Sequence, residues 1–133
     1  MKKLLIVLPL LVGLVAAVAT CGQDDVGIEC KMSIDPSDVT TATFNTMALD
    51  CRSRICMLNI GEAKPHCTQV CDSDSDCPDS SLSCPQAGYS CAIGSSVGEL
   101  PCCKVCICND RISGDQTSVQ AACAATEAFC PTL

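Results

Sequence analysis

Apolar side chains are concentrated at the N-terminus, where residues 4–19 form an almost unbroken apolar run. Lys2 and Lys3 precede the run, and small residues lead out of it. A positive start, an apolar segment and small residues, in this order, are typical of an export signal. The run contains Pro9 and Gly13 and is shorter than the roughly 20 apolar residues that span a bilayer, so we expect cleavage rather than retention as an anchor.

Two later runs have the pattern of β-strands. They are "GYSCAIG" (residues 88–94) and "LPCCKVCICND" (residues 100–110), and the stretch "SSVGE" separates them. This arrangement predicts a hairpin with a longer loop. Because side chains alternate between the two faces of a strand, Cys103, Val105 and Ile107 are expected to share one face of the second run.

The part of the chain before this hairpin has a weaker pattern. Residues 30–50 are rich in threonine and β-branched side chains, with a turn at Pro36, and they predict one or two short strands. Residues 51–84 carry cysteines at short intervals, with turn-forming residues between them. We expect loops held by disulfides in this block.

The C-terminal stretch, residues 113–130, is the best candidate for a helix. Asp115 or Thr117 can cap its N-terminus, its middle is rich in alanine, and a proline ends it. Cys123 and Cys130 fall on one stripe of this helix, about 10 Å apart, so each is expected to bond to the body of the domain. The predicted fold is small and disulfide-rich, with irregular loops, short β-strands including a hairpin, and one C-terminal α-helix.

The number of cysteines helps to decide which of two peptidases cleaves the signal. Residues 17–19 form an A-x-A site for the ordinary signal peptidase, which would release a soluble protein. Residues 18–21, "VATC", instead resemble the lipobox of bacterial lipoproteins, whose cysteine is lipidated and becomes the first residue. The chain has 15 cysteines, and an odd number leaves one thiol over in an exported protein. If Cys21 carries lipid, the other cysteines can close seven disulfides among Cys30, Cys51, Cys56, Cys67, Cys71, Cys77, Cys84, Cys91, Cys102, Cys103, Cys106, Cys108, Cys123 and Cys130.

The lipobox divides the chain into a lipoprotein signal peptide (residues 1–20), a lipidated N-terminus with a short tether (residues 21–29) and a disulfide-rich domain (residues 30–133). The resemblance implies a diacylglyceryl thioether on Cys21 and a third, amide-linked acyl chain such as palmitate. Two or more chains hold a protein stably on a membrane. Gly22, in place of Asp, implies transfer to the outer membrane, and a secreted or periplasmic soluble protein is the alternative.

Composition and charge narrow the possible partners. Cysteine exceeds a tenth of the mature chain, a level typical of disulfide scaffolds. Phe44, Tyr89 and Phe129 are the only aromatic side chains, so disulfides, worth about 2–4 kcal/mol each, must replace much of an apolar core. Loss of Lys2 and Lys3 with the signal changes the formal net charge from −7 by two units, to −9. This charge argues against nucleic acid or an anionic lipid surface as a partner.

Three aspartates imitate the start of a calcium-binding EF-hand loop. Asp72, Asp74 and Asp76 occupy alternating positions there. However, Cys77 stands where the loop needs glycine, and Ser83 stands where it needs a glutamate. The sequence therefore favours an acidic loop with Asp-capped turns over a calcium site.

Residues 102–108, "CCKVCIC", could bind zinc or copper(I), or carry out redox chemistry, if their thiols were free. An exported protein meets an oxidising compartment, which favours structural disulfides. His66 is the single histidine, and its position between Pro65 and Cys67 is interpreted as a solvated loop. No GxSxG or similar elbow accompanies it, so we predict no catalytic residue, no metal ligand and no cofactor.

Three segments, "CRSRICM", "HCTQVCDSDSDCP" and "PCCKVCICND", resemble small cysteine-rich lipoproteins of the myxobacterial type. The shared pattern, C-x(3)-C-x(2)-D-x-D-C-P, is matched by Cys67, Cys71, Asp74, Asp76, Cys77 and Pro78. The resemblance implies an envelope location and a disulfide scaffold. The D-x-D-C element is also similar to whey-acidic-protein modules, which inhibit proteases, although Cys84 stands alone where those modules have a cysteine pair.

The expected function is that of a lipid-anchored cell-envelope protein with a structural role or a role in binding a protein or glycan, and not that of an enzyme. One alternative is protease inhibition through residues 94–101, "GSSVGELP", which predicted strands flank. Another is metal or redox chemistry at residues 102–108. The pairing of the cysteines does not follow from their spacing.

Overall fold

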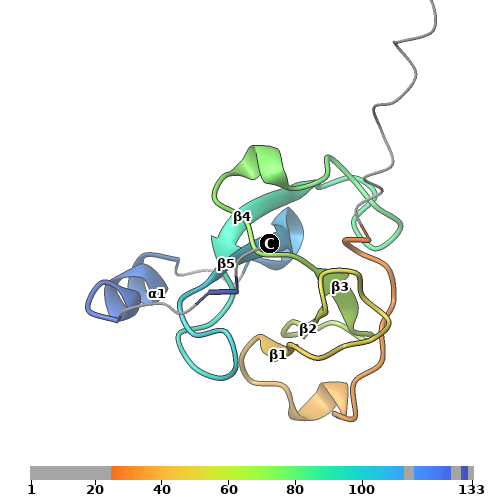
Figure 1. Cartoon of the computed structure of the whole chain (residues 1–133), viewed down its shortest axis with the longest axis horizontal. Coiled ribbons are helices and arrows are strands. Elements are labelled where there is room, and N and C mark those ends of the chain that lie inside the picture. The colour runs from red at the N-terminus through yellow and green to blue at the C-terminus, as the bar shows by residue number, and fades with distance from the viewer. Residues whose placement is uncertain (1–24, 113–115, 127–129, 132–133) are drawn as a thin grey trace, which may run out of the picture.

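Two short antiparallel sheets and one helix make up most of the regular structure in residues 25–112, 116–126 and 130–131, which are the residues that the computed structural model describes (Figure 1). The first sheet contains β1 (Thr43–Asn45), β2 (Ile55–Leu58) and β3 (His66–Thr68) in that order, and the second contains β4 (Tyr89–Ile93) and β5 (Lys104–Cys108). Helix α1 (Gln116–Cys123) follows. The predicted fold class is confirmed. The predicted signal peptide and Cys21 lie outside the described residues.

The predicted hairpin is β4 and β5, in antiparallel register with Cys91 opposite Cys106. Its side chains alternate as expected, because Cys103, Val105 and Ile107 all enter one apolar cluster. This cluster lies between the two sheets and includes Phe44 of β1 and Met57 of β2 together with Ala42, Ile55 and Leu100.

The end of β3 connects the two sheets. Thr68 Oγ1 donates a hydrogen bond of 2.7 Å to the carbonyl of Cys106. The amide of Cys106 donates in turn to the carbonyl of Gln69, at 3.0 Å, and Val70 forms an antiparallel bridge with Val105. The chain that leaves β3 therefore runs along β5.

Residues 51–84 were expected to form only loops, and this prediction is wrong for β2 and β3. All four side chains of β2 are buried, so its sequence "ICML" shows no alternation of apolar and polar positions. β3 has only three residues, and its buried side chains include a histidine and a threonine. Neither strand carries the pattern from which a half-buried strand is recognised.

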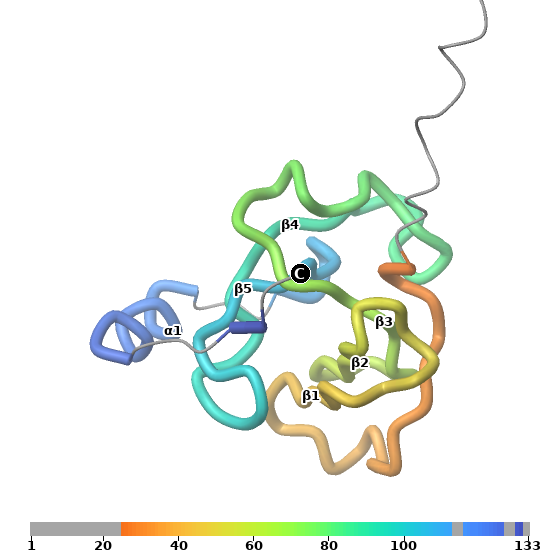
Figure 2. Tube along the Cα trace, viewed as in Figure 1, coloured from red at the N-terminus to blue at the C-terminus, as the bar shows by residue number. Residues whose placement is uncertain are grey.

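Residues 25–29, interpreted as part of the tether, lie against the domain. Gly27 donates to the carbonyl of Cys67 at 2.8 Å, and the amide of Cys67 donates to the carbonyl of Ile28 at 2.7 Å. Asp25 and Val26 are buried, and a carboxylate oxygen of Asp25 accepts from the amide of Arg52. Figure 2 shows this N-terminal segment running along the outer side of the first sheet.

Seven disulfides join the fourteen cysteines from Cys30 onward. Two hold the first sheet, three hold the loop after β3 to the β4–β5 hairpin, and two hold the C-terminal segment. In this order the pairs are Cys30–Cys56, Cys51–Cys67, Cys71–Cys91, Cys77–Cys106, Cys84–Cys108, Cys102–Cys123 and Cys103–Cys130.

Helix α1 is shorter than predicted, because it ends at Cys123 and does not reach Cys130. Cys123 and Cys130 bond to the adjacent residues Cys102 and Cys103. Both disulfides therefore fasten the C-terminal segment to the two residues just before β5. Thr117 lies inside α1 rather than at its cap, and Asp115 lies outside the described residues. Among the described residues, no helix has the length and apolar character needed to cross a membrane.

Candidate functional site

A surface cavity of about 760 Å³ lies beside the N-terminal segment. Its wall is formed by residues 26–29, by residues 61–65 of the β2–β3 loop and His66 at the start of β3, by Pro78 and residues 80–83, and by Arg111. We call it the His66 cavity. The four segments are far apart in the sequence, and the disulfides and the β3–β5 contact bring them together.

His66 is buried, so its interpretation as a solvated loop residue is wrong. It is the first residue of β3 and is only 3% exposed. An antiparallel backbone bridge to Glu29 and the disulfide of the next residue, Cys67, hold it in place. The proline before it looks like a loop signal, but the N-terminal segment covers this edge of the sheet.

The two ring nitrogens of His66 have different surroundings. Nδ1 lies 3.2 Å from Glu62 Oε2, at an angle outside hydrogen-bond geometry. Nε2 is buried and has no hydrogen-bond partner among the described residues. A buried polar atom without a partner is uncommon in native proteins and requires an explanation.

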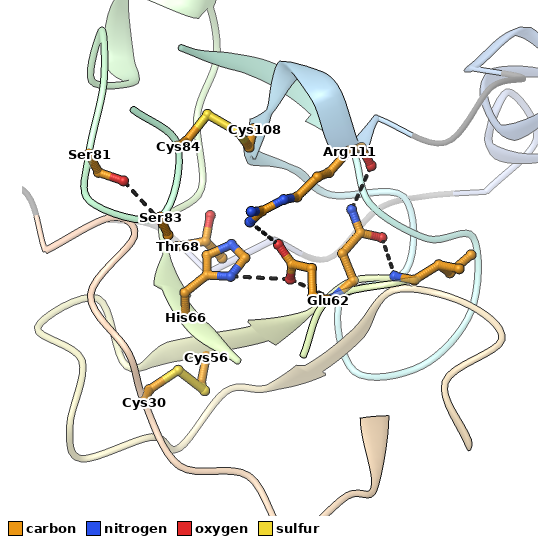
Figure 3. A network of polar contacts seen from close by, with 12 residues as sticks. Cys30, Cys56, Glu62, His66, Thr68, Ser81, Ser83, Cys84, Cys108 and Arg111 are labelled. Carbon is orange, nitrogen blue, oxygen red and sulfur yellow. Dashed lines mark hydrogen bonds and ion pairs between the residues drawn. A yellow bond between two sulfur atoms is a disulfide. The ribbon is translucent and has the colours of Figure 1, made fainter. Parts of the chain in front are cut away.

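Glu62 is the centre of the polar network, and its side chain is only 4% exposed. Oε1 accepts from Arg111 Nη1 at 2.5 Å, and Oε2 accepts from the amide of Asn59 at 2.9 Å. Burial raises the pKa of Glu62, but the contacts with His66, Asn59 and Arg111 more than offset it, so the pKa is below its ordinary value. Figure 3 shows His66 and Arg111 reaching the same carboxylate.

Arg111 also links the first sheet to the β4–β5 hairpin. Its carbonyl accepts from Asn59 Nδ2 at 2.7 Å, so the turn after β2 is fixed to the turn after β5. Nε lies 3.6 Å from Asp110 Oδ1, on the solvent side. The Arg111 side chain is 32% exposed, and Arg111 lines the cavity.

Three hydroxyl groups lie next to the network. Tyr89 OH is 2.7 Å from Ser81 Oγ and 2.9 Å from Ser83 Oγ, and the two serine oxygens are 3.1 Å apart. Ser81 and Ser83 line the His66 cavity. Gly27, with a positive φ of 86°, packs directly against this hydroxyl cluster.

The aspartates that imitate a calcium-binding loop have structural contacts. Asp76 Oδ2 accepts from the amides of Ser73 and Asp72, at 2.8 and 2.9 Å, and these bonds hold the pKa of Asp76 below its ordinary value. Asp74 Oδ1 accepts from the amide of Cys91 in β4 at 2.7 Å. These carboxylates cap a turn and fasten it to the hairpin, as the Asp-capped interpretation expected.

Residues 102–108 have no CxxC disulfide. Cys103 bonds to Cys130, and Cys106 bonds to Cys77. Some sulfur atoms of different disulfides lie close together, with Cys71, Cys77 and Cys106 within 4.8 Å of one another. Metal or redox chemistry needs thiolates. Here the cysteine sulfurs are bonded to one another.

The loop proposed for protease inhibition has a fixed base and an exposed tip. The amide of Cys102 donates to the carbonyl of Ser95 at 2.8 Å, and Leu100 is buried. Glu99 Oε2 accepts from the amide and hydroxyl of Thr46, at 2.8 and 3.0 Å. Val97, at the tip, is 59% exposed.

Sequence reasoning did not identify Glu62, Arg111, Ser81 or Ser83 as parts of a site. They belong to separate segments without a motif, and only the folded chain brings them together. Comparison with protein-family models, with curated proteins and with solved structures finds no match.

Proposed function

We propose that this chain is a lipid-anchored protein of the bacterial cell envelope, located at the outer membrane, with a binding role and no catalytic activity. One observation supports lipidation of Cys21. All fourteen cysteines from Cys30 onward are paired with one another. They leave no partner for Cys21, which stands at the end of the apolar run in a lipobox-like sequence.

The anchor would hold the domain close to the membrane. Only residues 22–24 separate Cys21 from Asp25, whose side chain is already buried in the domain. An extended chain covers at most about 3.6 Å per residue, so this distance is about 14 Å or less. Residues 26–29 form one wall of the His66 cavity, and the cavity would therefore lie near the lipid headgroups.

The His66 cavity favours binding over hydrolysis. A histidine that acts as general base needs a nucleophile within hydrogen-bond reach. Glu62 supplies the carboxylate, but no described hydroxyl bonds to Nε2 of His66. The fixed walls and the polar groups inside are what a binding protein requires, and the expected partner is a component of the cell envelope.

Mass spectrometry of the protein from native membranes tests the anchor, with thiol alkylation before reduction. We expect a diacyl or triacyl mass on Cys21 and no alkylated cysteine. The full chain carrying Cys21→Ser should leave the membrane fraction. A Cys30→Ser chain is the control, because it also loses one cysteine but should remain membrane-bound. An unmodified N-terminus at Thr20 would contradict the proposal.

A second candidate is protease inhibition, which the fixed base and exposed tip of residues 94–101 favour. A panel of proteases would be incubated with the protein, and slowed cleavage of a peptide substrate would be the signal. Val97→Asp should abolish the effect, whereas Leu49→Asp, at another exposed apolar position, should not. Rapid cleavage of the loop without inhibition would rule out this function.

A further inference from the structure

Several hydrogen-bond donors line the His66 cavity: the hydroxyls of Ser81 and Ser83, the guanidinium of Arg111 and the ammonium of Lys64. Of the two carboxylates in its wall, Glu62 already receives contacts on both oxygens, and Glu29 is paired with Lys64. An acceptor group on a ligand would meet these donors. We propose that this cavity binds an amphiphile that carries one carboxylate or phosphate group, an inference that rests on the binding role proposed above.

Two ion pairs in the cavity wall supply the cations that an anionic group would contact. Glu62 pairs with Arg111, and Glu29 pairs with Lys64 at 2.7 Å. The side chains of Arg111 and Lys64 are 32% and 68% exposed, so both cations remain partly open to a ligand. Asp110, which lies 3.6 Å from Arg111 Nε, is 61% exposed and screened by water.

His66 gives the cavity its most specific contact. Nδ1 faces the carboxylate of Glu62, so Nε2 points away from that carboxylate. Nε2 has no partner among the described residues. In Figure 3 the imidazole lies in the space between Glu62, Arg111 and Thr68. A ligand oxygen that reaches this space would satisfy Nε2 and also contact the guanidinium.

Two exposed apolar side chains belong to the cavity wall, and an apolar part of a ligand would cover them. Leu82 is fully exposed and Ile28 is 55% exposed, and both belong to the cavity wall. Pro65 and Pro78 continue this surface. The volume of about 760 Å³ is in the range of small-molecule sites, roughly 300–1,000 Å³. An amphiphile could place its anionic head against the polar groups of the cavity and its alkyl chain across Leu82 and Ile28.

Binding can be measured by titration calorimetry on the full chain carrying Cys21→Ser, which the ordinary signal peptidase site can still release. This variant has no lipid, so the result does not depend on the anchor. The probes are octanoate and octyl phosphate, with octanol and acetate as controls. We expect one molecule of octanoate or octyl phosphate to bind at least tenfold more tightly than octanol or acetate. Equal binding of octanol, or no binding of either anion, would overturn the proposal.

A vesicle sedimentation experiment distinguishes a membrane headgroup from a free amphiphile as the source of the anionic group. Phosphatidylcholine vesicles with and without phosphatidylglycerol would be sedimented with the same protein. Sedimentation with the anionic vesicles that octyl phosphate reverses would identify a membrane headgroup as the ligand. Binding of octanoate or octyl phosphate without sedimentation would identify a free amphiphile. Both results support the site, whereas sedimentation that the anions do not reverse, with no calorimetric binding, would contradict it.

Two pairs of variants test whether the ligand binds in this cavity. Leu82→Ser should weaken octanoate binding at least fivefold, while Val97→Ser, at an exposed position on another loop, should not change it. Arg111→Gln should weaken binding at least tenfold, while Arg54→Gln, outside the cavity, should not. Arg111 also supports Glu62, so the Leu82→Ser result decides the question if Arg111→Gln fails to fold. Equal affinity of Leu82→Ser and Val97→Ser would contradict the proposed site.

Discussion

Gly27 lies directly against the hydroxyl of Ser81, and no side chain fits between them. A Cβ at Gly27 would overlap Ser81 Oγ and would stand 2.6 Å from Ser83 Oγ. The backbone of Gly27 also has a positive φ of 86°, where other residues are strained. This contact seats the N-terminal segment on the domain, and the segment forms one wall of the His66 cavity.

Gly27→Ala is therefore expected to destabilise the domain by about 3 kcal/mol, from backbone strain together with overpacking. Gly61→Ala is the matched control. Gly61 also has a positive φ, of 77°, but nothing lies within 4 Å of its added Cβ, so it should cost only about 1 kcal/mol. Urea unfolding with the disulfides intact measures both. Equal losses would show that the Ser81 contact has no energetic weight.

The buried carboxylate of Glu62 predicts sensitivity to acid. Its pKa is lower in the folded protein than the ordinary value of 4.5. The stability it contributes is therefore fully present above pH 4.5 and is lost as the pH falls through the folded-state pKa. Thermal melting between pH 3 and pH 7 should show this decline.

Glu62→Gln should make the melting temperature less dependent on pH below 4.5. At neutral pH it should cost about 2–4 kcal/mol, because Arg111 and His66 lose the charge between them. Glu29→Gln is the control, since Glu29 is 62% exposed and its ion pair with Lys64 contributes little. An unchanged acid slope in Glu62→Gln would show that other carboxylates control it.

The sequence predicted the β4–β5 hairpin, because two strand-like runs flank a turn-rich loop. It also placed Cys103, Val105 and Ile107 on one face, and the structure has them in one cluster, with Cys106 and Cys108 in another. β2 was missed because Ile55–Leu58 has only four residues and lies in a block of cysteines and turn-forming residues. The alanine-rich C-terminus predicted a longer helix than α1, because propensity carries no information on the disulfides of Cys123 and Cys130.

The residues that form the His66 cavity were harder to predict from the sequence than the fold. His66, Ser81 and Arg111 are far apart in the sequence, and their meeting depends on which cysteines pair. Fourteen cysteines allow a very large number of pairings, and their spacing does not choose among them. Burial of His66 also depends on residues 25–29, which look like a solvated tether by composition alone.

The disulfide pairing makes a direct prediction about "CCKVCIC". Cys103 and Cys106 have the spacing of a redox pair, but each is bonded to a distant cysteine. Peptide mapping of the non-reduced protein should find Cys103 linked to Cys130 and Cys106 linked to Cys77. Trypsin is informative here, because cleavage after Lys104 separates Cys103 from Cys106. A Cys103–Cys106 bond would contradict the structure and reopen the redox interpretation.

Two disulfides of similar loop length should contribute unequally to stability. Cys102–Cys123 closes a separation of 21 residues and Cys51–Cys67 one of 16, so restriction of the unfolded chain gives about 3 kcal/mol for each. Their surroundings differ. Cys51 and Cys67 are 2% and 0% exposed, in a cluster with Cys30 and Cys56, whereas Cys102 and Cys123 lie at the edge, at 8% and 9%.

Cys102→Ser with Cys123→Ser should therefore cost about 3 kcal/mol and loosen only α1, which limited proteolysis of the C-terminal segment would detect. Cys51→Ser with Cys67→Ser should cost about 5 kcal/mol, because two hydroxyls then replace buried sulfurs beside β3. Urea unfolding compares the two double variants. A larger loss for the pair at Cys102 would mean that the C-terminal segment, and not the cluster under β3, determines the stability of the domain.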